Sequence, residues 1–144
     1  MPPVYDIFLS YNSRDRNAVR EVHEALKRRS LRPWIDFEAL TPGRLWQEEA
    51  EAGIKTCRAA AVFLGQSGIG PWENLEMRSL LTRAAQEGLL LIPVLLPGAP
   101  ERPELPNFLA EFTWVDLRAG ITADGIDRLV QGIPKKKKRT PLRG

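Results

Sequence analysis

Short apolar runs alternate along this chain with segments in which apolar residues recur at helical spacing. Residues 4–11 (VYDIFLSY) form the first run, which is typical of a strand buried on both faces of a parallel sheet. Asn12 and Ser13 follow as candidate helix caps, and the periodicity then predicts a helix that ends near Arg29. The same pattern predicts further strands at residues 31–36, 61–64, 89–95 and 112–117, and further helices at residues 45–56, 72–85 and 123–132.

Five strands that alternate with helices predict an α/β fold in which helices cover both faces of a parallel sheet. The small size of the chain favours a flavodoxin-like sheet of five strands in the order 2-1-3-4-5. Residues 31–36 are expected at an edge, because Pro33 has no amide hydrogen to donate to a neighbouring strand. In this order the first and third strands are neighbours at the switch point, so the loops at residues 10–13 and 65–71 should meet there.

The stretch from residue 62 to residue 85 carries the candidate site. It reads as a strand, a glycine-rich loop and a helix, and Trp72 and Glu76 lie four residues apart on one face at the start of that helix. Open α/β sheets bind ligands at the carboxyl ends of their strands, so an indole beside a carboxylate is a candidate site there. A structural interpretation stays open, in which Trp72 packs in the core and Glu76 favours the positive end of the helix dipole. Glu73 is in the same turn but points about 300° away around the helix.

Composition separates a folded body from a basic tail. Of the 144 residues 43% are hydrophobic, which predicts a single domain with a substantial core at residues 1–133. Six of the 21 basic residues and none of the 18 acidic residues lie in residues 135–144, so the body has a net charge of −3 although the whole chain has +3. An acidic body argues against nucleic-acid binding by the folded domain. Residues 134–144 are expected to be disordered, either as a linker to a sensor module or, alternatively, as a nuclear-localisation-like patch or a contact with an anionic surface.

Several common kinds of site have no signature in the sequence. It contains no G-x-G-x-x-G motif and no P-loop, and the third strand does not end in the aspartate of a phospho-receiver domain. With one histidine and one cysteine the sequence shows no metal-ligand pattern and implies no cofactor; His23 is expected on the surface and Cys57 in the core. No apolar run is long enough to span a membrane, the N-terminus has no signal sequence, and the single cysteine fits a reducing compartment, so we expect a cytoplasmic protein.

Four motifs carry a resemblance to a known family. They are YDIFLSY at the start, the ALTPG loop after the second strand, the W-x-x-x-E of Trp72 to Glu76, and FTW at residues 112–114. In order and spacing they resemble the Toll/interleukin-1 receptor (TIR) domain over roughly residues 4–133, and that family has the flavodoxin-like fold. Some of its members are scaffolds, whereas many bacterial and plant members cleave NAD+ at the nicotinamide–ribose bond. The short ALTPG loop resembles the loop of the bacterial, NAD-cleaving members.

The resemblance implies an NAD+ glycohydrolase that releases nicotinamide and a linear or cyclic ADP-ribose, is activated by self-association, and acts in bacterial anti-phage signalling. It implies Glu76 as the catalytic carboxylate and Trp72 as its aromatic partner. Some relatives carry arginines where this chain has Asn12 and Ser13, which leaves the phosphate contacts open. TIR–TIR contacts through residues 37–44 are also implied, and a non-catalytic interaction module is the alternative function. The further substrate-binding residues that the resemblance implies are Ser10, Tyr11, Asn12, Asp36, Phe37, Glu38, Leu40 and Trp46.

Overall fold

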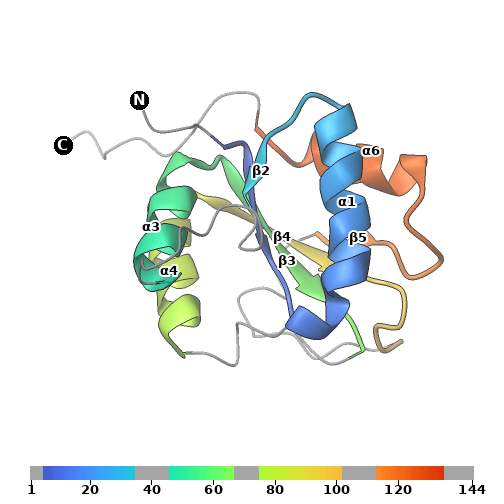
Figure 1. Ribbon diagram of the computed structural model, residues 1–144, viewed down its shortest axis with the longest axis horizontal. Helices are drawn as coiled ribbons and strands as arrows, with labels where there is room; N and C mark the ends of the chain where they lie inside the picture. Colours follow the sequence, from blue (N-terminus) through green and yellow to red (C-terminus); the bar gives the residue numbers. More distant parts are fainter. Residues whose placement is uncertain (1–4, 35–45, 67–74, 102–112, 135–144) are drawn as a thin grey trace.

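The computed structural model describes residues 5–34, 46–66, 75–101 and 113–134 (Figure 1). Its centre is a parallel sheet in the order β2-β1-β3-β4-β5, which confirms the predicted flavodoxin-like arrangement. The strands are β1 (Ile7–Ser10), β2 (Pro33–Trp34), β3 (Ala59–Leu64), β4 (Leu90–Leu95) and β5 (Val115–Asp116). The helices are α1 (Arg16–Arg28), α3 (Trp46–Thr56), α4 (Leu75–Gln86) and α6 (Ala123–Gln131), and a 3-10 turn, η1 (Ser13–Asp15), precedes α1.

The helices form one layer on each face of the sheet. α1 and α6 cover one face, and α3 and α4 cover the other (Figure 1). Ile7 and Leu9 of β1 pack into the core beneath α1, where they join Val22. Because side chains alternate across a strand, Phe8 and Ser10 lie on the opposite face, which α3 and α4 cover.

Close packing between the sheet and α3 depends on Gly53. The rings of Phe8 and Trp34 stack with their centroids 4.7 Å apart. A Cβ at position 53 would lie 2.6 Å from Trp34 Nε1, so glycine is what lets α3 approach the indole this closely. Gly53 O accepts a hydrogen bond from the Thr56 hydroxyl (2.9 Å) and from Cys57 Sγ (3.2 Å). Cys57 is fully buried, which confirms its predicted place in the core.

Asp6 holds the amino edge of the sheet just before β1. Its backbone N–H donates to Arg32 O (2.8 Å), and its carboxylate Oδ2 accepts from the backbone N–H of Arg32 (2.7 Å). Its other carboxylate oxygen, Oδ1, pairs with the guanidinium of Arg58, whose backbone N–H donates to Asp6 O (3.0 Å). Asp6 therefore ties together the starts of β2, β1 and β3, and both oxygens of its carboxylate have partners.

The bounds of the strands differ from those that the sequence pattern predicts. The apolar run at residues 4–11 yields only four strand residues in β1, whereas β3 begins two residues earlier than expected. β2 pairs with β1 alone in the described part of the chain, which confirms the edge position inferred from Pro33. The rest of the predicted second strand, at residues 35 and 36, lies outside the described residues.

The prediction that Asn12 and Ser13 cap the first helix is wrong. The Asn12 side chain accepts a hydrogen bond from the backbone N–H of Arg14 (2.9 Å) instead, which closes a tight turn. The chain then forms η1, and α1 begins at Arg16. A short polar side chain can cap a helix or close a turn, and the local sequence does not decide between the two.

The prediction that His23 lies on the surface is also wrong. His23 is 1% exposed and belongs to the buried stripe of α1. It lies four residues after Val19 and three before Leu26, both fully buried, so it shares their face of the helix. The apolar stripe read from the sequence was therefore too narrow by one position.

Candidate ligand site at the carboxyl edge of the sheet

The candidate site lies where β1 and β3 end side by side. Ser10, the last residue of β1, is in register with Val62, and β3 continues from there to Leu64. β1 leads into α1 on one face of the sheet, whereas α4, the next helix described after β3, lies on the other face (Figure 1). Neighbouring strands whose connections part in this way form a topological switch point, where α/β sheets leave a crevice for a ligand.

Ser10 places a buried hydroxyl at this edge. The residue is 2% exposed, and its Oγ has no hydrogen-bond partner among the described residues. Leaving such a group unpaired costs roughly 1–3 kcal/mol, so packing alone would favour an apolar side chain at this position. A buried polar group without a partner is informative because the great majority of such groups in folded proteins are paired.

Asp15 is a second polar group at the same edge. Its carboxylate lies directly against Gly65, the first residue after β3, where a Cβ would come closer than 3.0 Å to both carboxylate oxygens. Asp15 occupies the N-cap position of α1, yet its side chain makes no capping hydrogen bond. Its Oδ2 is buried and has no partner among the described residues. Burial removes water from the carboxylate and thereby raises the pKa of Asp15 above its ordinary value.

Asp15 is absent from the site residues that the sequence predicts. An aspartate just before a helix is ordinarily interpreted as a cap or a surface acid, and nothing in its neighbours indicates burial. The one signal is Gly65, because glycine at the end of a strand often marks a close approach by another part of the chain. That signal does not reveal which residue makes the approach.

The structure describes some of the other predicted site residues and not others. Tyr11 is 7% exposed and packs in the core beneath α1, and Asn12 is half-buried with its side chain in the turn described above. Trp46 is the first residue of α3, and Glu76 is the second residue of α4, in the first turn of that helix. Asp36, Phe37, Glu38, Leu40 and Trp72 lie outside the described residues, so their roles stay predictions.

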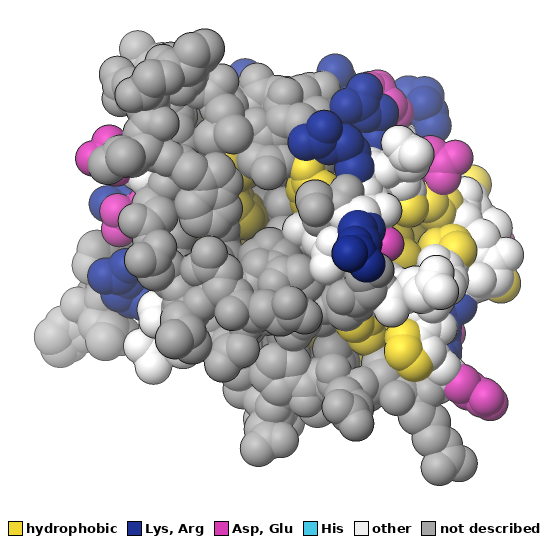
Figure 2. Space-filling model, turned by 60° about the horizontal axis from the view of Figure 1, so that its bottom comes forward, with side chains coloured by type: hydrophobic (Ala, Val, Ile, Leu, Met, Phe, Trp, Pro, Cys, Tyr) yellow, Lys and Arg dark blue, Asp and Glu magenta, His cyan; other side chains and the backbone are white. Residues whose placement is uncertain are grey.

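Charges of both signs lie on the side of the molecule seen in Figure 2. Basic and acidic side chains stand next to one another on the described part of this face, with apolar groups between them. Nucleic-acid sites usually show a stripe or patch of basic side chains. The mixed charge seen here gives no support to a nucleic-acid site, in agreement with the net charge of the body.

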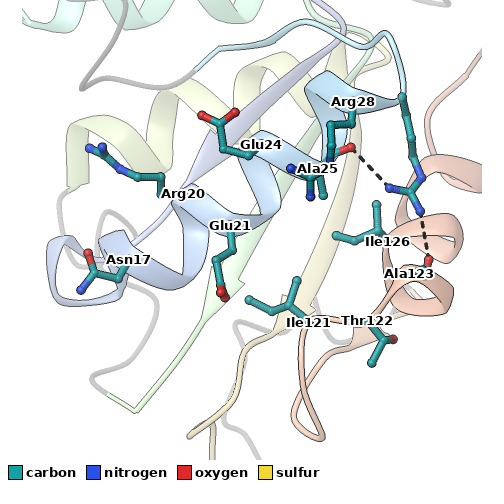
Figure 3. Close-up of a pocket in the computed structure, with 11 residues that line it drawn as sticks. Asn17, Arg20, Glu21, Glu24, Ala25, Arg28, Ile121, Thr122, Ala123 and Ile126 are labelled. Atoms are coloured by element: carbon teal, nitrogen blue, oxygen red, sulfur yellow. Dashed lines mark hydrogen bonds between the residues drawn. The ribbon is translucent and has the colours of Figure 1, made fainter.

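A separate groove of about 490 Å³ runs between α1 and α6 (Figure 3). Arg29 joins the two helices there, since its guanidinium donates to Ala123 O (3.3 Å) and pairs with Asp127 Oδ1 (3.0 Å). None of the residues that line the groove is a histidine, cysteine or serine, so it offers no nucleophile with an adjacent imidazole base. The charged side chains that line it come from α1 and from the residue that follows it; they are Arg20, Glu21, Glu24, Arg28 and Arg29.

The described segments contain neither a metal-binding cluster nor a membrane-spanning helix. Nowhere in them do three or more His, Cys, Asp and Glu side chains gather as potential metal ligands. None of their helices is both long enough and apolar enough to cross a bilayer; α1 has 13 residues, whereas a span needs about 20.

Comparison with known proteins gives a family and a fold. The family model described as TIR domain matches residues 7–130. Similar solved structures include the TIR domain of the Toll-related receptor TRR-2 from Hydra magnipapillata, with 22% identity and a TM-score of 0.62 over 78% of this chain and 84% of that one. The TIR domains of the activated Roq1 resistosome, which recognises the pathogen effector XopQ, have 19% identity and a TM-score of 0.68 over 88% of this chain and 98% of theirs.

A third similar structure is a metazoan TIR-STING receptor from C. gigas in complex with 2′,3′-cGAMP. It has 21% identity and a TM-score of 0.71, and the match covers 99% of this chain but only 41% of the receptor. At these identities the likeness shows the fold alone. A search of curated protein sequences returned no match.

Proposed function

The chain belongs to the TIR domain family, and from this premise we propose that it is an NAD+ glycohydrolase with Glu76 as its catalytic carboxylate. The observation that supports this most directly is the position of Glu76 in the first turn of α4, which is the next helix described after β3 along the chain. Ser10 and Asp15 add polar groups to the same edge of the sheet. Nucleotides bind at edges of this kind in α/β proteins.

The proposed reaction needs stabilisation of positive charge more than it needs proton transfer. When the bond between C1′ and the pyridinium nitrogen breaks, its electron pair goes to the nitrogen, and nicotinamide leaves as a neutral molecule without a general acid. The ribose is left with an oxocarbenium-like charge, as in glycoside hydrolysis. The Glu76 carboxylate accepts hydrogen bonds from the ribose hydroxyls and stabilises that charge. Water then adds to C1′ and loses a proton, or an internal nucleophile of the ADP-ribose closes a cyclic isomer.

The rest of the proposed pocket follows from the family resemblance. Trp72 stacks on a flat ring of the substrate, as an indole face can do. A neighbouring copy of the chain completes the pocket through residues 37–44, so self-association activates the enzyme. The basic segment at residues 134–144 links the domain to a sensor module, and the chain acts in the cytoplasm in bacterial immune signalling. The residues proposed to contact NAD+ from the loop after β2 and from α3 are Asp36, Phe37, Glu38, Leu40 and Trp46.

Incubating the purified chain with NAD+ and measuring free nicotinamide tests the proposal. We expect release of nicotinamide and a specific activity that rises with protein concentration, because neighbouring copies contribute to the pocket. Chromatography of the same samples separates linear from cyclic ADP-ribose. A constant specific activity from nanomolar to high micromolar protein contradicts activation by self-association. No release at any concentration from folded protein contradicts the enzyme and favours a non-catalytic TIR–TIR interaction module.

A further inference from the structure

Asp15 takes no part in the mechanism above, although its carboxylate lies at the same edge of the sheet. Within the described segments it has no ion pair and no side-chain hydrogen bond, and it differs in this from three other aspartates. Asp6 pairs with Arg58, Asp116 with Arg118, and Asp127 with Arg29. Each of those three carboxylates is paired with a guanidinium, whereas no described residue forms an ion pair with Asp15.

The position of Asp15 is fixed by packing. Its carboxylate rests against Gly65, which has no side chain to displace it, and it begins α1 at the point where the chain turns away from β1. Ser10, whose buried hydroxyl also lacks a partner in the described part of the chain, ends β1 five residues earlier. Two polar groups at one switch point therefore have no partners among the described residues, which indicates an edge built to receive a polar ligand.

An unpaired and poorly hydrated carboxylate acts on a ligand through its charge. No described residue pairs with the carboxylate of Asp15, and its Oδ2 is buried, so its field extends over several ångströms into the crevice. A positive charge placed there is stabilised, and a neutral group of the same shape is not. NAD+ carries such a charge on its pyridinium ring, and the same charge moves to the ribose as the proposed bond breaks.

We propose that Asp15 is a specificity-determining residue whose negative charge, which no described residue pairs, selects a cationic ligand at the switch point, and so favours the pyridinium ring of NAD+ over the neutral ring of NADH. This inference rests on the proposed function, since it concerns the ligand of the same site. It assigns Asp15 a role distinct from that of Glu76: Asp15 acts through its field, and Glu76 through contact with the ribose.

Kinetics with an oxidised and a reduced ligand test this role. The kcat/KM for NAD+ and the inhibition constant of NADH are measured for the wild type and for Asp15→Asn, which keeps the shape of the side chain and removes its charge. We expect kcat/KM to fall about tenfold while the inhibition constant of NADH changes less than about twofold. Asp124→Asn is the matched control, because Asp124 is an exposed aspartate in the first turn of α6, and it should change neither value.

Two further variants separate charge from packing. Asp15→Glu keeps the charge, so any damage to packing should weaken NAD+ and NADH alike and leave their ratio near that of the wild type. Gly65→Ala displaces the carboxylate without removing it and should reduce the preference for NAD+. An equal loss for both ligands in Asp15→Asn, or no loss for either, overturns the proposal. So does a full loss of the preference in Asp15→Glu.

The failure of this proposal is distinguishable from failure of the proposed function. If the wild type releases nicotinamide and Asp15→Asn keeps its preference for NAD+, the proposed enzymatic activity is supported and the proposed role of Asp15 is contradicted. If the wild type releases none, the dissociation constants of NAD+ and NADH from titration calorimetry still give the preference. Loss of that preference in Asp15→Asn then supports the proposed role of Asp15. If the wild type binds neither ligand, both the role of Asp15 and the proposed enzymatic function are contradicted.

Discussion

The aspartates near the two ends of β1 differ in whether their carboxylates have partners. At the amino end, both carboxylate oxygens of Asp6 are occupied, one by the guanidinium of Arg58 and the other by the backbone of Arg32. Beyond the carboxyl end, the carboxylate of Asp15 presses against Gly65, and its buried Oδ2 has no partner in the described part of the chain. Eight residues, four of them in β1, separate an acid whose oxygens both have partners from one that has no side-chain partner among the described residues.

This difference indicates which edge of the sheet contributes to stability and which edge is available for a ligand. A carboxylate whose oxygens are both bonded joins strands together and has little capacity left for a ligand. A carboxylate without partners weakens the fold, because its burial is not compensated, but its charge remains available to a ligand. The amino edge of the sheet is therefore the stable end, and the carboxyl edge is the end suited to binding.

The largest expected effect is on catalysis at the carboxyl edge. Glu76→Gln should lower the turnover of NAD+ about a hundredfold, because the amide keeps the shape of the side chain but loses the charge that stabilises the ribosyl cation. The melting temperature of the Glu76→Gln variant should hardly differ from that of the wild type. Nicotinamide release and thermal melting, measured together with Glu73→Gln as the control, check this. Wild-type turnover by folded Glu76→Gln protein would remove Glu76 from the site.

The next effect is on stability at the amino edge. Asp6→Ala removes the carboxylate that pairs with the Arg58 guanidinium and accepts a hydrogen bond from the Arg32 N–H, which should destabilise the protein by about 2 kcal/mol. Urea unfolding measures this loss. Asp6→Asn keeps an oxygen for Arg32 and should cost less. Turnover per folded molecule should stay at the wild-type value, and a selective loss of activity in Asp6→Ala would break the proposed division between the two edges.

Stability at the carboxyl edge should respond in the opposite direction. The pKa of Asp15 is raised by burial, so the folded state binds a proton more tightly than the unfolded state does. The ionised carboxylate therefore lowers stability above its folded pKa, and this penalty disappears as the pH falls below the unfolded pKa near 4. Asp15→Asn should raise the melting temperature by about 1–3 °C at pH 7 and by nothing near pH 3. A lower melting temperature at pH 7 would show that Asp15 is a structural residue.

The smallest effect is expected for a paired carboxylate at the carboxyl edge. Hydrogen bonds from the side chain and the backbone of Arg118 lower the pKa of Asp116. This stabilisation is present above the ordinary pKa of an aspartate and is lost as the pH falls through the lowered value. Because the pair is largely exposed, Asp116→Asn should lower the melting temperature at pH 7 by less than about 1 °C. A larger loss of melting temperature would show that the location of a carboxylate at the carboxyl edge, and not its pairing with an arginine, determines its contribution to stability.

The order of the strands was predictable because it follows from patterns that are local in the sequence. Apolar runs mark the strands, helical spacing marks the helices, and the missing amide of Pro33 marks the edge. The position of Glu76 in the first turn of its helix was predictable for the same reason, since it follows from the end of one run and the start of the next. Its side chain lies outside the described part of the structure, so its role as a catalytic residue stays a prediction.

The errors and omissions share a different cause, which is dependence on distant parts of the chain. His23 is buried because α1 packs against the sheet and α6 over a wider stripe than its apolar residues mark. Asn12 closes a turn that its own sequence does not distinguish from a helix cap. The half-buried carboxylate of Asp15 lies against Gly65, far along the sequence, so no local pattern reveals the contact. Contacts of this kind become visible only after the sheet is assembled.

The hydrogen bonds at the amino end of β2 also bear on how copies of this domain avoid aggregating. Arg32 directs both its N–H and its C=O toward Asp6. Polar groups of consecutive residues in a strand point to opposite sides, so Pro33 turns its nitrogen toward the open side of the sheet. That nitrogen carries no hydrogen, so the outer rim of β2 offers no donor there to a strand from another molecule. The proline therefore disfavours edge-to-edge pairing of β2 with a strand of another copy.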